Sequence, residues 1–439
     1  WEPKFRANAG DRAKLEALEV NDEPACGWGA MPEALKAPGV GWQRGAFATN
    51  VAQPNYFWKG VKVDERDAQG NYSEEKPGVY TYKQPVPPAA GPELARYEIG
   101  PFIDRASYRI FADTSSAVAA LIKGEIDMLL NPLGADPGIR AQYRTEPKIK
   151  TQDNKSHGMF YQSFNLRRKP FGSGPLQKDP KFRDDDIIGS RFRQAWNCLI
   201  DRDFTTQTLF QRVAFSLQTV VSPANAFWFN EKLRAPCDEF SEQTDKTAAR
   251  AKKVAAATAI LKSVGFTWVK EPKADTTSGA VTAGEGIVLP VILGSADAAA
   301  GAAVTVPAGT IAVGAKVALG TKATLTAGAA KAESDAAGKV SLALPAGTTS
   351  VTLSAAGKVY FYGAGDKTKD RMPTVNFIYP NSAYDPRRAL FGVQTEKWVN
   401  QIGIPVRGVP TGFNVIVTKV FDEQDFDVWS LGWSLGGLT

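Results

Sequence analysis

The stretch TVNFIYPNSAYDPRRALFGVQTEKWVNQIGIPVRGV, from Thr374 to Val409, decides the fold class of this chain. Its two ends, TVNFIY and IPVRGV, are short β-branched and aromatic runs that predict strands. Between them Asp385 is placed to cap a helix and Pro386 to begin it. The helix is expected to end at Gly403, with Ile404 packing back on Val399. A helix between two strands indicates a mixed α/β fold.

The same pattern extends toward the N-terminus. In DTSSAVAALIKGEIDML, Asp113 or Thr114 can cap a helix that ends at Gly124. The residues expected on its buried face are Val118, Leu121 and Ile122. The following EIDMLL predicts a short strand.

Two further helices are predicted in the middle of the chain. The Ala-rich segment TDKTAARAKKVAAATAILKSVGF should end at Gly265, with Phe266 folding back on Leu261. Its expected buried stripe is Val254, Ile260, Leu261 and Val264. The segment FRQAWNCLI places Phe192, Ala195, Trp196 and Leu199 on one helical face. Asp201 or Asp203 can cap a second helix that runs through Val213. GMFYQSFNL and DFDVWSLGW add two strand candidates.

One region differs in composition from the rest. From Ile287 to Val359 aromatic residues are absent, and KVSLALP and TSVTLSA alternate with a period of two between the turns DAAGK and PAGTT. This pattern predicts a compact antiparallel β-sandwich of about immunoglobulin size. The alternative is a flexible low-complexity linker. We therefore divide the chain into residues 1–286, an inserted sandwich at 287–359, and a continuation of the α/β lobe at 360–439.

Composition excludes several classes of protein. With 43% hydrophobic residues and 10 Trp the chain is globular, and its interleaved charges, +6 overall, do not indicate nucleic-acid binding. The single histidine, His157, argues against a transition-metal site. Cys26, Cys198 and Cys237 match no zinc spacing, and both one disulfide, such as Cys198 to Cys237, and three free thiols stay open. We expect no cofactor.

The termini and the apolar stretches carry two further expectations. The longest weakly polar region, from Ile287 to Gly320, is interrupted by Pro290, Asp297, Pro307 and Lys316, so no transmembrane helix is expected. The chain begins at Trp1 without Met or an apolar leader, and we expect a processed or excised chain.

Seven motifs occur in an order that matches one protein family. They are NYFWKG, YRIFADTSSAVAALIKGEIDML, FYQSFNLRRKPF, FRQAWNCLIDRDF, AAATAILKSVGF, EKWVNQIGIPV and DFDVWSLGW. The series resembles the extracellular solute-binding proteins of the oligopeptide, dipeptide and nickel class, family 5, which serve ABC importers. It covers about Asn50 to Ala280 and Met372 to Trp433 and implies mainly the second lobe of a type II periplasmic-binding-protein-like fold. The segment SDAAGKVSLALPAGTTSVTLSAAG resembles immunoglobulin-like and transthyretin-like modules of bacterial surface proteins.

The resemblance implies a function and two binding residues. It implies capture of a peptide or similar small organic solute in an interlobe cleft, delivery to membrane permease subunits, an extracytoplasmic and lipid-anchored location, and a monomer. Trp433 matches the family's cleft tryptophan, and Tyr161 matches a tyrosine four residues before the Asn of a strand. The family's aspartate three residues after that tryptophan is Gly436 here, which puts recognition of a peptide's ammonium group in doubt. Asp425 or Asp427 could replace it.

The one match to a catalytic motif in the sequence is incomplete. Gly432 to Gly436 reads G-x-S-x-G with Ser434 as nucleophile, but a nucleophile elbow also needs a following helix and later acidic and histidine partners. We expect a binding protein and no enzyme. The alternative is a surface interaction or sensing protein that keeps the binding scaffold and contacts a protein partner through the sandwich.

Overall fold

The structure is a computed structural model that describes a defined set of residues: 42–43, 47–52, 56, 58–65, 72–83, 95–129, 143–151, 158–173, 177–212, 214–223, 229–234, 237–240 and 245–433. They fall into two compact units, Trp1–Ala112 and Asp113–Thr439. Each unit is described by itself.

The first unit contains two antiparallel sheets. One has the order β1-β2-β7, from β1 (Trp42–Gln43), β2 (Phe47–Val51) and β7 (Arg105–Arg109). The other has the order β5-β4-β3-β6, from β3 (Lys62–Glu65), β4 (Tyr72–Lys76), β5 (Tyr80–Lys83) and β6 (Ala95–Glu98). None of these strands was predicted from the sequence.

The second unit begins with α3 (Thr114–Lys123), which the capping signals located correctly. Asp113 Oδ1 accepts a hydrogen bond from the Ser116 amide, and Gly124 ends the helix with φ of 75°. Ile122, however, is 40% exposed, so its assignment to the buried face was wrong. Residues 125–129 of EIDMLL form bends and irregular chain instead of a strand.

A four-stranded sheet forms the centre of the α/β body, by which we mean this sheet with α6, α7, α8 and α9. Its order is β22-β21-β23-β8, from β8 (Met159–Phe164), β21 (Val375–Pro380), β22 (Val406–Thr411) and β23 (Val428–Trp433). β21 runs parallel to both of its neighbours, and β8 is antiparallel to β23. All four strands were predicted, and the mixed α/β class is confirmed.

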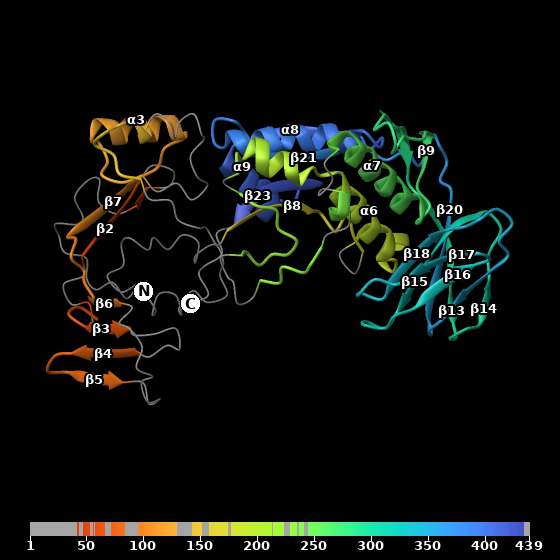
Figure 1. The fold of residues 1–439 in the computed structure, drawn as a ribbon, viewed down its shortest axis with the longest axis horizontal. Coiled ribbons are helices and arrows are strands. Elements are labelled where there is room, and N and C mark those ends of the chain that lie inside the picture. Colours follow the sequence, from red (N-terminus) through yellow and green to blue (C-terminus); the bar gives the residue numbers. More distant parts are fainter. Residues whose placement is uncertain are drawn as a thin grey trace, which may run out of the picture. The chain divides into compact units, whose positions relative to one another are not determined.

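The helices cover the two faces of this sheet unequally. α6 (Ile187–Leu199), α7 (Lys246–Lys262) and α8 (Pro386–Asn400) share one large core with Phe377 and Val428 of the sheet. The short α9 (Phe413–Val417) and the π-helix η5 (Thr418–Asp422) cover the other face, in a smaller core with Trp429. Figure 1 shows α8 and α9 close to β21 and β23.

The predicted caps explain where the helices begin and end. Asp385 accepts hydrogen bonds from the amides of Arg387 and Arg388, and Gly403 adopts φ of 80° beyond α8. Gly265, with φ of 85°, ends the α7 region, and the buried Phe266 donates its amide to the Leu261 carbonyl. Both helix ends thus follow the glycine signals in the sequence.

The helix after Asp201 is shorter than predicted. The Asp201 carboxylate caps it through the Phe204 amide, but η3 (Phe204–Leu209) is a π-helix. Gln211 and Arg212 have φ of 47° and 64°, and two successive left-handed residues end a right-handed helix. The expected continuation to Val213 was therefore wrong.

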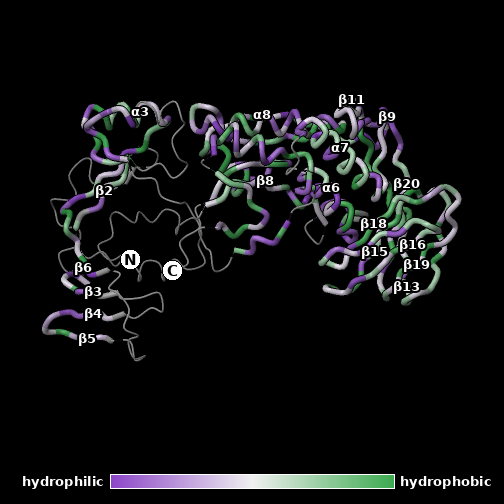
Figure 2. The backbone as a smooth tube through the Cα atoms, viewed as in Figure 1, coloured by the Kyte–Doolittle hydropathy of each residue, from purple (hydrophilic) through white to green (hydrophobic). Residues whose placement is uncertain are grey.

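Residues 291–363 form two stacked four-stranded antiparallel sheets. One has the order β13-β20-β15-β18, from β13 (Val291–Ala298), β15 (Thr310–Val317), β18 (Lys339–Ala343) and β20 (Gly357–Gly363). The other has the order β14-β19-β16-β17, from β14 (Ala303–Thr305), β16 (Thr324–Ala327), β17 (Ala330–Glu333) and β19 (Ser350–Leu353). A separate apolar core lies between them, and Figure 2 shows hydrophobic residues along these strands.

Ile287 and Val288 belong to a different part of the fold. They lie in β12 (Glu285–Val288), which pairs with β9 (Thr267–Lys270), and a small hairpin of β10 (Lys273–Ala274) and β11 (Val281–Thr282) precedes it. The division at 287 and 359 stays a prediction, because the paired strands of the sandwich run from 291 to 363.

The sandwich is joined to the α/β body by a continuous core. Ala312, Tyr360 and Tyr362 of its strands belong to the core that contains α6 and α7. Arg191 of α6 donates to Ser341 Oγ at 3.0 Å and forms an ion pair with Asp335. The sandwich and the α/β body are therefore packed against each other without a gap between their cores.

This junction lies at the amino edge of the central sheet. Met372, three residues before β21 begins, donates its amide to the Ile287 carbonyl, and the Leu289 amide bonds the Asp370 carbonyl. β21 starts at Val375, so the sandwich is connected where the parallel strands begin and not where they end.

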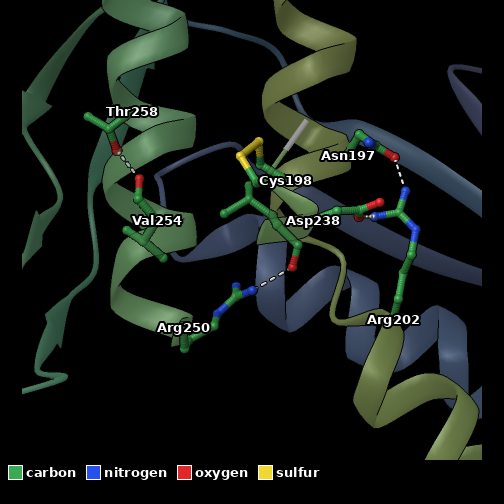
Figure 3. The surroundings of a disulfide bond; sticks show 9 residues. Asn197, Cys198, Arg202, Asp238, Arg250, Val254 and Thr258 are labelled. Atoms are coloured by element: carbon green, nitrogen blue, oxygen red, sulfur yellow. Dashed lines mark hydrogen bonds and ion pairs between the residues drawn. A yellow bond between two sulfur atoms is a disulfide. The ribbon is translucent and has the colours of Figure 1, made fainter. Parts of the chain in front are cut away.

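A disulfide joins Cys198, in the last turn of α6, to Cys237 (Figure 3). The sequence left open either one disulfide or three free thiols, and the structure shows the disulfide. Cys26 lies outside the described residues. Beside it, Arg202 forms an ion pair with Asp238, and Arg250 donates to the Leu199 carbonyl. The disulfide closes a loop of 39 residues.

Removing this disulfide should lower the free energy of unfolding. Closing a loop of this length restricts the unfolded chain, which contributes about 3 to 4 kcal/mol. We expect a Cys198→Ala, Cys237→Ala double variant to lose about this much in urea-induced unfolding, with Cys26→Ala as control. An unchanged unfolding midpoint in the double variant would contradict the pairing.

The junction of sandwich and body should weaken in acid. Lys339 Nζ and Lys316 Nζ lie 3.0 and 3.2 Å from Asp186 Oδ2. Burial alone would raise the pKa of Asp186, but the hydrogen bonds and charges of the two lysines outweigh it and lower that pKa. A carboxylate with a lowered folded-state pKa stabilises the fold above its unfolded-state pKa, near 4, and this contribution disappears as the pH falls through the folded value.

We therefore expect Asp186→Asn to lower the melting temperature by about 2 to 4 °C at neutral pH, and the difference from wild type to close toward about pH 3. Asp297→Asn, on the exposed part of β13, is the control. A difference that persists unchanged at about pH 3 would show that the carboxylate's charge is not its cause.

Candidate functional site

The carboxyl edge of the central sheet is where a ligand site is expected. β21, β22 and β23 end there at Pro380, Thr411 and Trp433, and the antiparallel β8 begins there at Met159. The connection from β21 to β22 runs through α8 on one face. The connection from β22 back to β23 runs through α9 and η5 on the other face. Open α/β sheets bind ligands beside such a reversal, at the carboxyl ends of the strands.

Trp433 and Tyr161 meet at this edge. Trp433 pairs with Met159, and Tyr161 pairs with Leu431, so both side chains belong to the same face of the sheet. The indole Nε1 of Trp433 donates to Tyr161 Oη at 2.5 Å, and Trp433 is 50% exposed. The structure thus brings together the two residues that the resemblance singled out, 272 positions apart in sequence.

An aromatic cluster supports this pair from the same face. Trp429 contacts Tyr161 edge to face at a centroid distance of 5.3 Å, and Phe421 lies 5.7 Å from Trp429 and 6.3 Å from Trp433. Phe426 completes the cluster 6.3 Å from Trp429. Phe421 is 47% exposed, so it and Trp433 form an accessible apolar surface. Phe421 was not predicted as a site residue, although the recurrence of aromatic residues in VFDEQDFDVW was an available signal.

Asp425 and Asp427 are not placed to serve this surface. They precede β23 and therefore lie at its amino end, a full strand length from Trp433. Arg168 binds both, through Nη2 to Asp425 and Nη1 to Asp427, each at 2.7 Å. The hydrogen bond and charge of Arg168 lower the pKa of Asp425. The hypothesis that either aspartate replaces the family's carboxylate was wrong, because both are at the opposite edge and already paired.

The same contacts correct the interpretation of the basic run. A short basic run such as Arg167, Arg168 and Lys169 is most often a solvated loop. Instead Arg168 joins the turn after β8 to the start of β23, and Lys169 Nζ lies 3.0 Å from Asp179. The two carboxylates that pair with Arg168 lie more than 250 residues after it in the sequence.

Several residues considered in the sequence lie outside the described residues: His157, Ser434 and Gly436. Within the described ranges, no group of three or more His, Cys, Asp or Glu side chains could hold a metal ion. Among the helices that the structure describes, none is long and apolar enough to cross a membrane.

Comparison with known proteins gives one family match. Residues 40–319 match the family model described as bacterial extracellular solute-binding proteins, family 5 Middle. No curated protein matches the chain.

Solved structures give similar but distant matches. The oligopeptide-binding protein AppA of Bacillus subtilis, in complex with a nonapeptide, is 14% identical with a TM-score of 0.44, over 90% of this chain and 45% of its own. The oligopeptide-binding protein of Thermus thermophilus, with a pentapeptide, is 12% identical with a TM-score of 0.40, over 89% and 42%. NikZ of Campylobacter jejuni, with Ni(L-His), is 15% identical with a TM-score of 0.40, over 90% and 45%. The chain thus spans less than half the length of each of these structures.

The Trp433 hydrogen bond should be visible in the titration of Tyr161. Burial raises the pKa of the Tyr161 phenol, and the hydrogen bond from Trp433, which favours the phenolate, acts against that rise. Trp433→Phe keeps an aromatic ring but removes the donor, so we expect the pKa of Tyr161 to rise further. The measurement is a ¹³C-tyrosine NMR titration, with the Tyr161 signal assigned from Tyr161→Phe. A lower pKa in Trp433→Phe would contradict the geometry.

Proposed function

Because the chain belongs to the bacterial extracellular solute-binding proteins of family 5, we propose that it captures a small solute for an ABC importer. The proposed solute is a peptide or a similar small organic molecule. It binds in a cleft between the lobe that contains Trp433 and a second lobe, and the protein then docks on permease subunits in the membrane. The proposed location is outside the cytoplasm, with a lipid anchor, and the proposed state is a monomer.

One observation carries the proposal to particular residues. Trp433 and Tyr161 come from distant segments, are joined by a hydrogen bond, and lie at the carboxyl edge beside the reversal of strand order. A half-exposed tryptophan held in one orientation offers a large flat apolar contact at little entropic cost. We propose both residues as solute contacts.

The physical basis is a clamp with two opposed faces. Closing the lobes on a solute removes its apolar surface and that of Trp433 from water, which favours the closed form only when solute is present. The cluster of Phe421, Trp429 and Tyr161 holds the tryptophan before the solute arrives, so little order has to be gained on binding.

We propose binding without catalysis. The family is one of solute-binding proteins, and the two aspartates nearest to Trp433 in the preceding sequence are engaged by Arg168. The alternative of a surface interaction protein has no specific observation in its favour among the described residues.

Native mass spectrometry of the protein purified from its host without refolding tests the proposal. We expect a small organic molecule to co-purify, or, where the cleft is empty, a mixture of random short peptides to yield retained members. Trp433→Ala should weaken retention at least about 10-fold, as truncation of a central aromatic contact does.

Leu319→Ala is the control, because Leu319 is 83% exposed and follows β15 in the sandwich. It should leave retention unchanged. Wild-type protein that retains neither a co-purified molecule nor any offered peptide would overturn the proposed function.

A further inference from the structure

Phe160 lies at the same edge as Trp433 but on the opposite face of the sheet. It directly precedes Tyr161 in β8, so its side chain points to the α8 side. It is 38% exposed, and in β8 it is the one exposed residue. Trp433 and Phe160 therefore offer two accessible aromatic side chains on the two sides of one strand end.

A glycine makes room for the Phe160 ring. Phe160 pairs with Gly432, the residue before Trp433. A Cβ at position 432 would lie 2.6 Å from Phe160 Cδ1, which is closer than two non-bonded carbon atoms can approach. The ring therefore lies across the backbone of β23, in a place that only glycine leaves open.

Two further contacts hold the ring in place. The Phe210 ring packs on it at a centroid distance of 5.6 Å, and the Arg388 guanidinium carbon lies 5.0 Å from its centroid. Phe210 is almost fully buried, and the π-helix η3 that precedes it belongs to the segment closed by the Cys198–Cys237 disulfide. Phe160 is thus a half-exposed ring with little freedom to move.

The position of Arg388 restricts what the ring can bind. The Arg388 guanidinium beside the ring already takes up the ring's attraction for a cation, so a ligand ammonium buried against Phe160 would lose its hydration without compensation. Asp385 Oδ2 accepts a hydrogen bond from Arg388 Nε at 2.6 Å, but Asp385 is only 7% exposed and is not open to a ligand ammonium. Uncharged apolar and aromatic groups meet no such penalty.

We infer that Phe160 is a second solute contact, which selects an uncharged apolar or aromatic group over a cationic one. This inference rests on the proposed function, because it assumes that a solute occupies the carboxyl edge. Beyond the proposed function, it adds a preference for one chemical class of solute group and a contact residue on the face of the sheet opposite to Trp433.

The test offers the full chain a mixture of short peptides that are randomised at every position. Retained peptides are identified by mass spectrometry for wild type, Phe160→Ala, Phe160→Tyr and Leu166→Ala. Leu166 is a matched control, since it is 48% exposed and follows β8 at the opposite edge. Thermal unfolding of each variant shows that it is folded.

Wild type should enrich peptides with Phe, Leu or similar side chains and deplete those with Lys or Arg. Phe160→Ala should bind the enriched peptides about 5- to 10-fold more weakly and lose the depletion, as expected for one aromatic contact. Phe160→Tyr and Leu166→Ala should keep the wild-type affinity for the enriched peptides and the depletion of cationic ones. Peptides retained equally by wild type and Phe160→Ala, or a wild-type preference for cationic peptides, would overturn this inference alone. If wild type retains no offered peptide but holds a co-purified molecule of another kind, this inference alone is overturned. If it holds neither, the proposed function fails and this inference with it.

Discussion

Asp427 fixes the register on which the site depends. Its Oδ1 accepts from Arg168 in the turn after β8, its Oδ2 accepts from the Asn376 amide in β21, and its carbonyl accepts from the Asn165 amide. One residue therefore ties β23 to both neighbours at the amino edge. A slip of β23 by one residue would reverse the face of every side chain on it and move Trp433 away from Tyr161. The aromatic pair at one edge is a consequence of the polar contacts at the other.

The local features of this fold were predictable because their causes are local. Asp385, Gly403 and Gly265 act within a few residues of their own positions, and the strand candidates of the central sheet needed only composition and neighbouring turns. The disulfide, by contrast, had several possible states, and only the approach of α6 to Cys237 decides between them. Patterns of short range predict elements, and they do not predict which elements meet.

The side-chain contacts that were not predicted share one physical reason. Arg168 reads as part of a basic loop, yet its carboxylate partners lie in a segment far along the chain. The roles of Phe421 and Phe160 depend on strand order and on the space left by Gly432, and neither is visible in the spacing of nearby residues. The resemblance supplied Trp433 and Tyr161, since it carries information about contacts that the residues alone do not.

The continuous core between the sandwich and the α/β body has a mechanical consequence. Tyr360 and Tyr362 are packed with α6 and α7, so the sandwich is not free to rotate independently at that junction. It extends from the amino edge, away from the strand ends that carry Trp433 (Figure 1). Any rotation of the α/β body must carry the sandwich with it as a lever arm, and the displacement grows with distance from the pivot. The sandwich therefore turns through the same angle as the binding edge, and its far end is displaced further than any part of the body that lies nearer to the pivot.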